Sequence, residues 1–280
     1  MRNGHPPRPH RPIRYLLAWL VHLYTATGLI AAAGMGVLLC ESTVTTAAVR
    51  WTFVLMLVAT LIDATDGTLA RWVRVKDVLP GFDGRRLDDI VDFLTYTVLP
   101  LLLIWRTGLL PSGWEAVLLL PLIASAYGFS QVMAKTPDGY FLGFPSYWNV
   151  VAFYLYILPL PGWIRVALLA GLALMTFVPS LYLYPTQRGR LNQVTNVLGF
   201  AWVFLLIGVL WEFDDPPVAR MLALLSLAFP IYYLAASWAV TLQVWLRAAE
   251  ARREHRPVRV PRPRVNPLRG FRRFLTRRRH

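Results

Sequence analysis

Eight apolar segments, separated by short polar or proline-containing stretches, run along almost the whole sequence. A helix needs about 20 predominantly apolar residues to cross the hydrocarbon core of a bilayer. Most segments approach or exceed that length, and the fifth is short and rich in aromatic residues. They are Tyr15–Leu39, Ala47–Thr65, Leu87–Trp105, Ala116–Ala134, Tyr147–Leu160, Ile164–Tyr184, Val194–Trp211 and Ala219–Trp245. The pattern predicts an all-α integral membrane protein with about eight transmembrane helices.

The composition agrees with a membrane protein. The chain is 56% hydrophobic and only 16% charged, and its mean hydropathy of +0.46 is high for a soluble domain. The net charge of +14 is carried by residues that flank the apolar segments, which favours anionic lipid headgroups over nucleic acid as partners. The single cysteine, Cys40, excludes an internal disulfide and a cysteine-cluster metal site.

The distribution of basic residues predicts the orientation of the chain. An even number of spans puts both termini on one side, and the strongly basic C-terminal tail is expected on the cytoplasmic side. We therefore expect residues 1–14 to form a basic cytoplasmic arm and residues 15–246 a transmembrane catalytic domain. Residues 247–280 are expected to form a cytoplasmic tail rich in proline and arginine, which binds anionic lipid.

Acidic residues gather where the second apolar segment ends and the third begins. On a helix with about 100° per residue, Asp63, Asp66 and Arg71 fall within an arc of about 140°, together with the small residues Gly67 and Ala70. In the next segment Gly84, Asp88 and Asp92 follow at i, i+4 and i+8, which is one stripe of a helix. We therefore expect four carboxylates to converge between two helices, with room left for a bulky ligand.

Four carboxylates in a low-dielectric space repel one another unless cations or protons neutralise them. Oxygen-only ligands favour a hard ion such as Mg²⁺ or Mn²⁺, and two such ions can clamp a phosphoryl group. Arg71 is placed to hold a phosphate oxygen, and a carboxylate that is partly free can accept a proton from an attacking hydroxyl. The pattern predicts metal-dependent phosphoryl transfer at the cytoplasmic membrane face.

Two other interpretations of the acids remain open. They could simply pair with neighbouring basic residues at the membrane interface, among them Arg85 and Arg86. They could also form the cation site of a transporter, although such sites usually lie near the bilayer midplane at broken helices.

The eight positions in the pattern D-x-x-D-G-x-x-A-R…G-x-x-x-D-x-x-x-D, from Asp63 to Asp92, resemble the signature of the CDP-alcohol phosphatidyltransferases. Twelve residues, Trp72 to Asp83, separate the arginine from the second glycine, a longer gap than is usual in that family. The gap resembles the bacterial phosphatidylcholine synthase branch, as do the stretches Gly139–Tyr156 and Phe177–Asn192. The resemblance covers most of the chain from the second segment to the seventh.

The resemblance implies the family fold in a bacterial inner membrane, and a transferase of phospholipid biosynthesis. The implied reaction is CDP-diacylglycerol plus choline giving phosphatidylcholine plus CMP. The expected cofactor is Mg²⁺ or Mn²⁺, as two ions. A homodimer is expected only by analogy with the family. The same fold with serine, inositol or glycerol phosphate as the acceptor is the alternative.

The resemblance also implies roles for the matched residues. Asp63, Asp66, Asp88 and Asp92 would bind the metal ions, and Asp92 would also be the general base. The remaining matched residues, and two arginines between the sixth and seventh segments, would bind CDP-diacylglycerol. They are Gly67, Ala70, Arg71, Gly84, Arg188 and Arg190.

Choline needs a separate argument, because a quaternary ammonium donates no hydrogen bond and is held by aromatic faces. Tyr96, one turn beyond Asp92, is one candidate, and the aromatic pair Tyr147 and Trp148 is another. Asn149 could orient the choline hydroxyl or cap a helix. Because aromatic residues also anchor proteins at bilayer interfaces, each of these residues has an alternative structural role.

Overall fold

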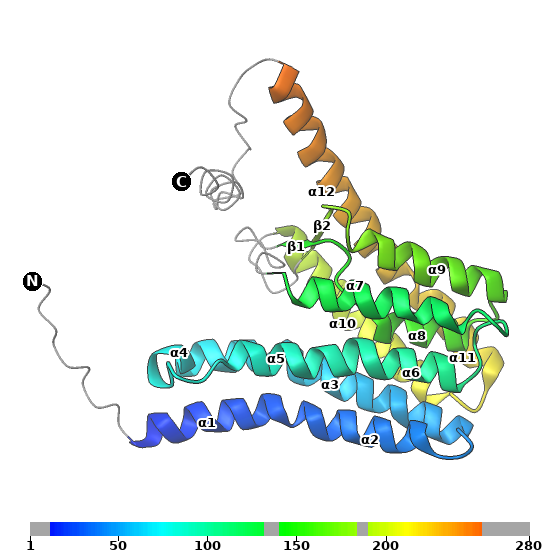
Figure 1. Cartoon of the computed structure of the whole chain (residues 1–280), viewed down its shortest axis with the longest axis horizontal. Coiled ribbons are helices and arrows are strands. Elements are labelled where there is room, and N and C mark those ends of the chain that lie inside the picture. Colours follow the sequence, from blue (N-terminus) through cyan, green and yellow to red (C-terminus); the bar gives the residue numbers. More distant parts are fainter. Residues whose placement is uncertain (1–11, 132–139, 184–189, 254–280) are drawn as a thin grey trace, which may run out of the picture. The chain divides into compact units, whose positions relative to one another are not determined.

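The computed structural model describes residues 12–131, 140–183 and 190–253, and the chain divides into two compact units, Met1–Thr107 and Gly108–His280. Each unit is described by itself. Both are mostly helical (Figure 1). Within the described residues, four helical stretches are long and apolar enough to cross a membrane: Pro12–Cys40, Thr46–Val73, Gln193–Trp211 and Pro216–Glu250. The protein is a multi-pass membrane protein, and the prediction of eight spans remains a prediction.

The first unit is a layer of long helices that pack side by side (Figure 1). Its first apolar segment forms α1 (Pro12–Ala26) and α2 (Gly28–Cys40), with a break at Thr27. The second forms α3 (Thr46–Val73), which begins where the Thr45 hydroxyl accepts a hydrogen bond from the Ala48 N–H. This cap satisfies one of the backbone donors that a helix start leaves unpaired.

The third apolar segment of the sequence is continuously helical from Gly84 to Arg106, but its form changes along its length. It consists of α5 (Gly84–Asp92), a π-helical turn η1 (Phe93–Val98) and α6 (Leu99–Arg106). The short helix α4 (Val75–Val78) lies between α3 and α5. A π-helical turn widens the helix locally and is often found at functional sites, and this one directly follows Asp92.

The second unit contains the remaining helices and the only strands among the described residues. Its helical elements are η2 (Glu115–Leu118), α7 (Leu119–Phe129), α8 (Trp148–Ile157), α9 (Gly162–Met175), α10 (Arg190–Trp211), α11 (Pro216–Ser226) and α12 (Ala228–Arg253). Pro230 cannot donate to the Ser226 carbonyl, and the helix is interrupted at Leu227. The predicted last segment is therefore two helices, and α12 runs on into the predicted tail.

The all-α prediction needs one correction, because β1 (Tyr140–Leu142) and β2 (Leu181–Leu183) pair in antiparallel fashion. Phe141 lies opposite Tyr182 in this pair. The predicted sixth segment thus stops being helical at Met175. Three-residue strands are too short to show the alternating pattern that identifies a strand in a sequence.

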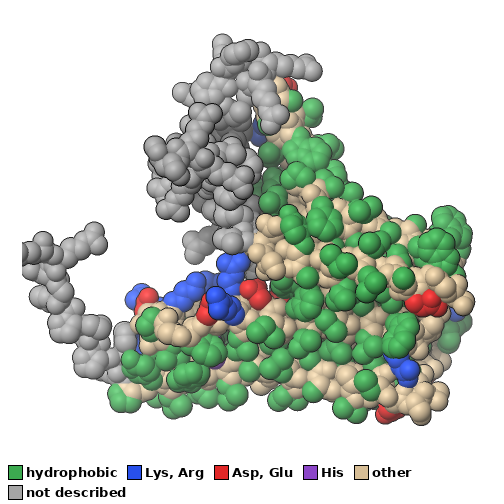
Figure 2. Space-filling model, viewed as in Figure 1, with side chains coloured by type: hydrophobic (Ala, Val, Ile, Leu, Met, Phe, Trp, Pro, Cys, Tyr) green, Lys and Arg blue, Asp and Glu red, His purple; other side chains and the backbone are tan. Residues whose placement is uncertain are grey.

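Hydrophobic side chains cover much of the visible surface of each unit (Figure 2). Exposed aromatic residues include Trp72 in the first unit and Trp163 and Trp211 in the second. Large exposed apolar surfaces are unusual in soluble monomers but are what a lipid-facing surface requires.

Replacing Gly143 with alanine is expected to lower the melting temperature of the purified protein in detergent by more than 10 °C. Gly143 has a φ of +80°, and a Cβ there would overlap the Thr176 carbonyl oxygen. The left-handed backbone and a clash with main-chain atoms each cost free energy of folding. Gly113→Ala is the control, because Gly113 has a φ of +86° but open space around it. Equal shifts in the two variants would contradict the clash.

Candidate functional site

The predicted acidic residues lie on two helices of the first unit. Asp63 and Asp66 are on the last part of α3, and Asp88 and Asp92 are on α5. The helix α3 ends at Val73 because Arg74 adopts a left-handed conformation (φ 57°), which closes a helix C-terminus. The chain then returns through α4 and re-enters a helix at Gly84, so the two halves of the motif face each other.

Three of the four carboxylates converge. Oxygen atoms of Asp63, Asp88 and Asp92 all lie within 4.8 Å of one another, and the three side chains are half-buried. Carboxylate oxygens at this separation fit a hard divalent cation, which takes oxygen ligands at about 2.0–2.6 Å. The cluster could therefore hold a metal ion, and the predicted meeting of α3 with α5 is present in the structure.

Asp66 is not part of this group of three. Its side chain is buried, and its Oδ2 accepts a hydrogen bond of 2.8 Å from the Thr25 hydroxyl of α1. At the immediately preceding position of each helix, the hydroxyls of Tyr24 and Thr65 lie 2.8 Å apart. The helix α1 thus contributes partners to the site that the motif itself does not contain.

Tyr96 is directly connected to the acidic cluster. Its side chain is buried, and its hydroxyl donates a hydrogen bond of 2.8 Å to Oδ2 of Asp63. Hydrogen bonds of this kind fix the orientation of a ligating carboxylate. The sequence suggested Tyr96 as a choline contact. In the structure its hydroxyl is placed to hold the Asp63 carboxylate in one orientation.

The two motif glycines face side chains of the protein. A Cβ at Gly67 would lie 3.3 Å from Nη1 of Arg71, and Nη2 of Arg71 donates a hydrogen bond of 2.9 Å to the Thr68 hydroxyl. A Cβ at Gly84 would overlap the ring of His22 on α1 and lie 2.9 Å from its Nδ1. Gly84 therefore allows α1 and α5 to approach closely, a role that was not predicted for it.

The twelve-residue insert packs against α1. Val75 and Val78 of α4 are buried in a cluster with Ala18 and Val21 of α1, and the ring of Phe82 lies 4.4 Å from the ring of His22. The insert thereby covers part of α1 around Ala18 and Val21 and packs against His22, which in turn lies against Gly84. This packing gives the insert a physical role that its sequence did not reveal.

Replacing Gly84 with alanine is expected to lower activity by about 10- to 100-fold. The new methyl group would push α5 away from His22, and a displacement of about 1 Å at a catalytic group can cost about 100-fold in rate. The variant His22→Ala should restore part of the lost activity when it is combined with Gly84→Ala. Gly81→Ala, at a position with nothing within 4 Å, is the control. No recovery in the double variant would contradict the proposed contact.

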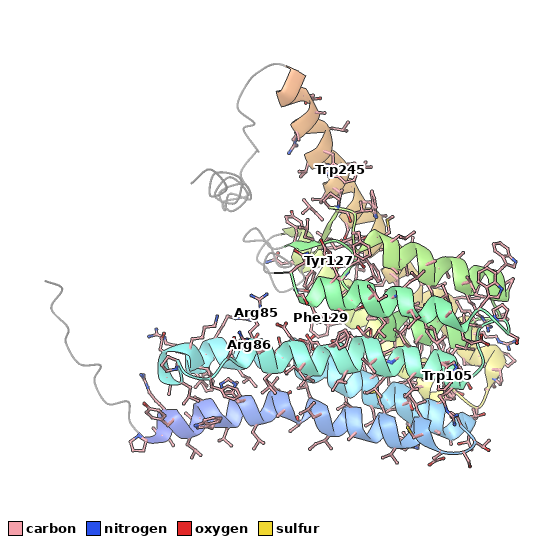
Figure 3. The ribbon with its side chains drawn as sticks, viewed as in Figure 1. Arg85, Arg86, Trp105, Tyr127, Phe129 and Trp245 are labelled. Atoms are coloured by element: carbon pink, nitrogen blue, oxygen red, sulfur yellow. The ribbon has the colours of Figure 1, made fainter. Side chains whose placement is uncertain are left out.

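Basic side chains lie on the first turn of α5, next to the acidic stripe. Arg85 and Arg86 project from this turn (Figure 3), and both are exposed. Arg85 pairs with Asp89 at 3.9 Å, and Arg86 pairs with Asp83 at 3.3 Å. Interface pairing therefore does occur, but these pairs use Asp83 and Asp89 and not the three clustered carboxylates.

The other predicted site residues lie in the second unit or outside the described residues. Trp148 is completely buried, and its indole N–H donates a hydrogen bond of 2.7 Å to the Ser125 hydroxyl. Asn149 is buried in the first turn of α8, and its side-chain oxygen accepts a hydrogen bond of 2.9 Å from the Val150 N–H. Tyr147 is half-buried. Arg188 lies outside the described residues, and of Arg190 only its place at the start of α10 is described.

Sequence reasoning missed both Thr25 and His22 as contacts of the motif residues. The Thr25 hydroxyl also donates a hydrogen bond of 3.4 Å to the Val21 carbonyl. Threonines in apolar helices commonly make this local bond, so nothing in the sequence marks Thr25 as a site residue. Within its own segment His22 meets only the ring of Trp19, at 6.0 Å, as an ordinary packed residue would. Only the fold brings both residues to the motif.

Comparison with known proteins gives a consistent result. No protein-family model matches the chain. A phosphatidylcholine synthase of Pseudomonas aeruginosa is 33% identical over 240 residues, which cover 85% of this chain and 95% of that protein. The phosphatidylcholine synthase of Legionella pneumophila is 40% identical over 182 residues, covering 64% and 69%. That of Rhizobium johnstonii is 31% identical over 231 residues, covering 80% and 91%.

Proposed function

The chain belongs to the phosphatidylcholine synthase family, and on that premise we propose that it condenses CDP-diacylglycerol with choline to give phosphatidylcholine and CMP. The observation that carries the proposal is the convergence of Asp63, Asp88 and Asp92 within 4.8 Å, from two different helices. The enzyme is then a CDP-diacylglycerol–choline O-phosphatidyltransferase. The motif from Asp63 to Asp92 makes it a CDP-alcohol phosphatidyltransferase.

The proposed cofactor is Mg²⁺ or Mn²⁺, as two ions. Asp63, Asp88 and Asp92 would hold them, and Asp66, one turn from Asp63 on α3, would complete the ligand set. The fit rests on the oxygen-only chemistry of the cluster. When bound, such ions neutralise charge on the diphosphate and make CMP a better leaving group.

The side chains of this site have distinct tasks in the proposed reaction. The choline hydroxyl attacks the phosphorus that bears diacylglycerol, the bond from that phosphorus to CMP breaks, and Asp92 accepts the hydroxyl proton. Arg71 holds the diphosphate through its guanidinium fork. Gly67 and Ala70 keep this face of α3 free of bulky side chains, and Tyr96 keeps Asp63 in one orientation.

Further parts of the proposal rest on the sequence pattern and the family. They are eight spans in the CDP-alcohol phosphatidyltransferase fold, a bacterial inner membrane, both termini in the cytoplasm, and a homodimer. All eight predicted segments coincide with helices over at least half of their length, which supports the number of spans. Arg188 and Arg190 would contact a substrate phosphate, and residues 247–280 would bind anionic lipid.

The test is an assay of the purified protein with CDP-diacylglycerol, Mn²⁺ and a panel of labelled alcohols. Label from choline should enter lipid much faster than label from serine, inositol or glycerol phosphate. If another alcohol is incorporated and choline is not, the acceptor is wrong while the reaction class stands. If no alcohol is incorporated, the reaction class fails as well.

A further inference from the structure

A short segment of the first unit contacts both halves of the acidic motif. It runs from Thr25, near the end of α1, to Gly28, the first residue of α2. The Thr25 hydroxyl donates a hydrogen bond of 2.8 Å to Oδ2 of Asp66 on α3. A Cβ at Gly28 would overlap the side chain of Val91 on α5, the residue before Asp92. The segment therefore lies against the α3 half of the motif and against the α5 half.

The first apolar helix is interrupted in this segment, and local hydrogen bonds fix the interruption. The Thr27 N–H lies 3.0 Å from the carbonyl oxygens of both Leu23 and Tyr24, and the Thr27 hydroxyl donates to the Tyr24 carbonyl at 2.6 Å. Hydroxyl groups that bond to a preceding carbonyl often bend a helix. The backbone that carries Thr25 is thus held by its neighbours where its hydroxyl meets Asp66.

The bond between Thr25 and Asp66 is buried. The two residues are 7% and 6% exposed. The Thr25 hydroxyl has one proton, and its acceptors are the Val21 carbonyl at 3.4 Å and the Asp66 carboxylate at 2.8 Å. The shorter bond, to the charged acceptor, is the stronger. Because the donor is a neutral hydroxyl, it orients the carboxylate without neutralising the charge that attracts a cation.

We propose that Thr25 is a positioning residue, which holds the Asp66 carboxylate in the orientation that binds a metal ion beside Asp63. The inference rests on the proposed function, because it assumes that the acidic cluster binds Mg²⁺ or Mn²⁺. Asp63 and Asp66 are three residues apart on α3, so they share one face of that helix. The hydroxyl of Tyr96 orients Asp63, and that of Thr25 does the same for Asp66. Each carboxylate of α3 is therefore oriented by a hydroxyl from another helical element.

A neighbouring contact separates this role from simple helix packing. The hydroxyls of Tyr24 and Thr65 lie 2.8 Å apart and also join α1 to α3. Neither residue belongs to the acidic motif. Loss of this bond weakens the same pair of helices but leaves the donor of Asp66 in place.

The experiment compares Thr25→Val with Tyr24→Phe. Each purified full-length variant is freed of divalent cations, and Mn²⁺ binding without substrate is followed by the electron paramagnetic resonance signal of free Mn²⁺. Thr25→Val keeps the shape of the side chain and should lower Mn²⁺ affinity by about 10- to 100-fold, the usual effect of losing a hydrogen bond to a metal ligand. Tyr24→Phe should change it by less than about twofold, because no ligating carboxylate loses its donor. Thr25→Ser, which keeps the hydroxyl, should restore most of the affinity.

A double variant tests whether the effect passes through Asp66. In an Asp66→Ala background, Thr25→Val should lower Mn²⁺ affinity by no more than about twofold further, since the effects of residues that act as a unit do not add. Thr25→Ala gives the same comparison if valine is not tolerated. Thr52→Val controls for the loss of a buried threonine hydroxyl, because Thr52 lies on α3 and donates to the Ala48 carbonyl of its own helix. It should leave Mn²⁺ affinity unchanged.

Three results would overturn the inference while leaving the proposed function intact. The first is an unchanged Mn²⁺ affinity in Thr25→Val. The second is an equal loss in Thr25→Val and Tyr24→Phe, which would show a loosened contact between α1 and α3. The third is a full further loss from Thr25→Val in the Asp66→Ala background. Absence of Mn²⁺ binding by the unaltered protein would overturn the proposed metal site and the inference together.

Discussion

Replacing Asp92 with asparagine is expected to lower the rate of phosphatidylcholine formation by about 10²- to 10⁴-fold, the range for loss of a general base. An amide of the same shape cannot accept the proton of the choline hydroxyl, and it contributes less charge to the cluster with Asp63 and Asp88. Because Arg71 and the other carboxylates remain, CDP-diacylglycerol should still bind within a few-fold of its usual affinity. The measurements are the turnover rate and the binding of labelled CDP-diacylglycerol.

Asp89→Asn is the matched control for this prediction. Asp89 is on the same helix and is also half-buried, but it pairs with Arg85 and is not one of the clustered carboxylates. Its replacement should leave turnover within about threefold of the original rate. Robust product formation by Asp92→Asn would remove Asp92 from the role of base. Equal losses in both variants would indicate a general defect in α5.

Removal of divalent cations should abolish activity completely, and addition of Mg²⁺ or Mn²⁺ should restore it. Three carboxylates this close repel one another and the diphosphate unless cations are present. Tyr96→Phe should raise the Mn²⁺ concentration for half-maximal activity by about 10- to 100-fold, the usual effect of losing a hydrogen bond to a metal ligand. Free Mn²⁺, followed by its electron paramagnetic resonance signal, gives the affinity without relying on turnover.

Tyr127→Phe is the control for Tyr96→Phe. Tyr127 lies on α7 beside Phe177 (Figure 3), and its hydroxyl is not part of the acidic cluster. Its replacement should leave the Mn²⁺ dependence unchanged. Full activity after chelation, or an unchanged Mn²⁺ affinity in Tyr96→Phe, would contradict the assignment of Asp63 as a metal ligand.

The sequence predicted those features that depend on local pattern. Apolar segments of membrane length identified helices, and the spacing from Asp63 to Arg71 identified one face of α3, because both follow from the helix repeat alone. The same spacing argument placed Asp88 and Asp92 opposite Asp63, as the structure has them. Membership of the phosphatidylcholine synthases, suggested by the motif and the length of the insert, is confirmed by the relatives.

Features that depend on which distant segments meet could not be predicted. The partner of Asp66 is Thr25, 41 residues earlier in the chain, and nothing in either helix alone indicates the pair. Gly84 was interpreted as a position that leaves room for the substrate. Its contact with His22 could not be predicted, because it arises only when α1 packs on α5. The insert had no explanation until α4 was seen to pack against α1.

The most direct test of the central claim follows two labels through one reaction. The purified protein is given CDP-diacylglycerol with ³²P in the phosphate that bears diacylglycerol, together with ¹⁴C-choline and Mn²⁺. The account predicts that ³²P and ¹⁴C enter phosphatidylcholine in equal amounts and that the released CMP carries no ³²P. Release of ³²P with the nucleotide, or phosphatidylcholine that contains ¹⁴C without ³²P, would contradict transfer of the phosphatidyl group to choline.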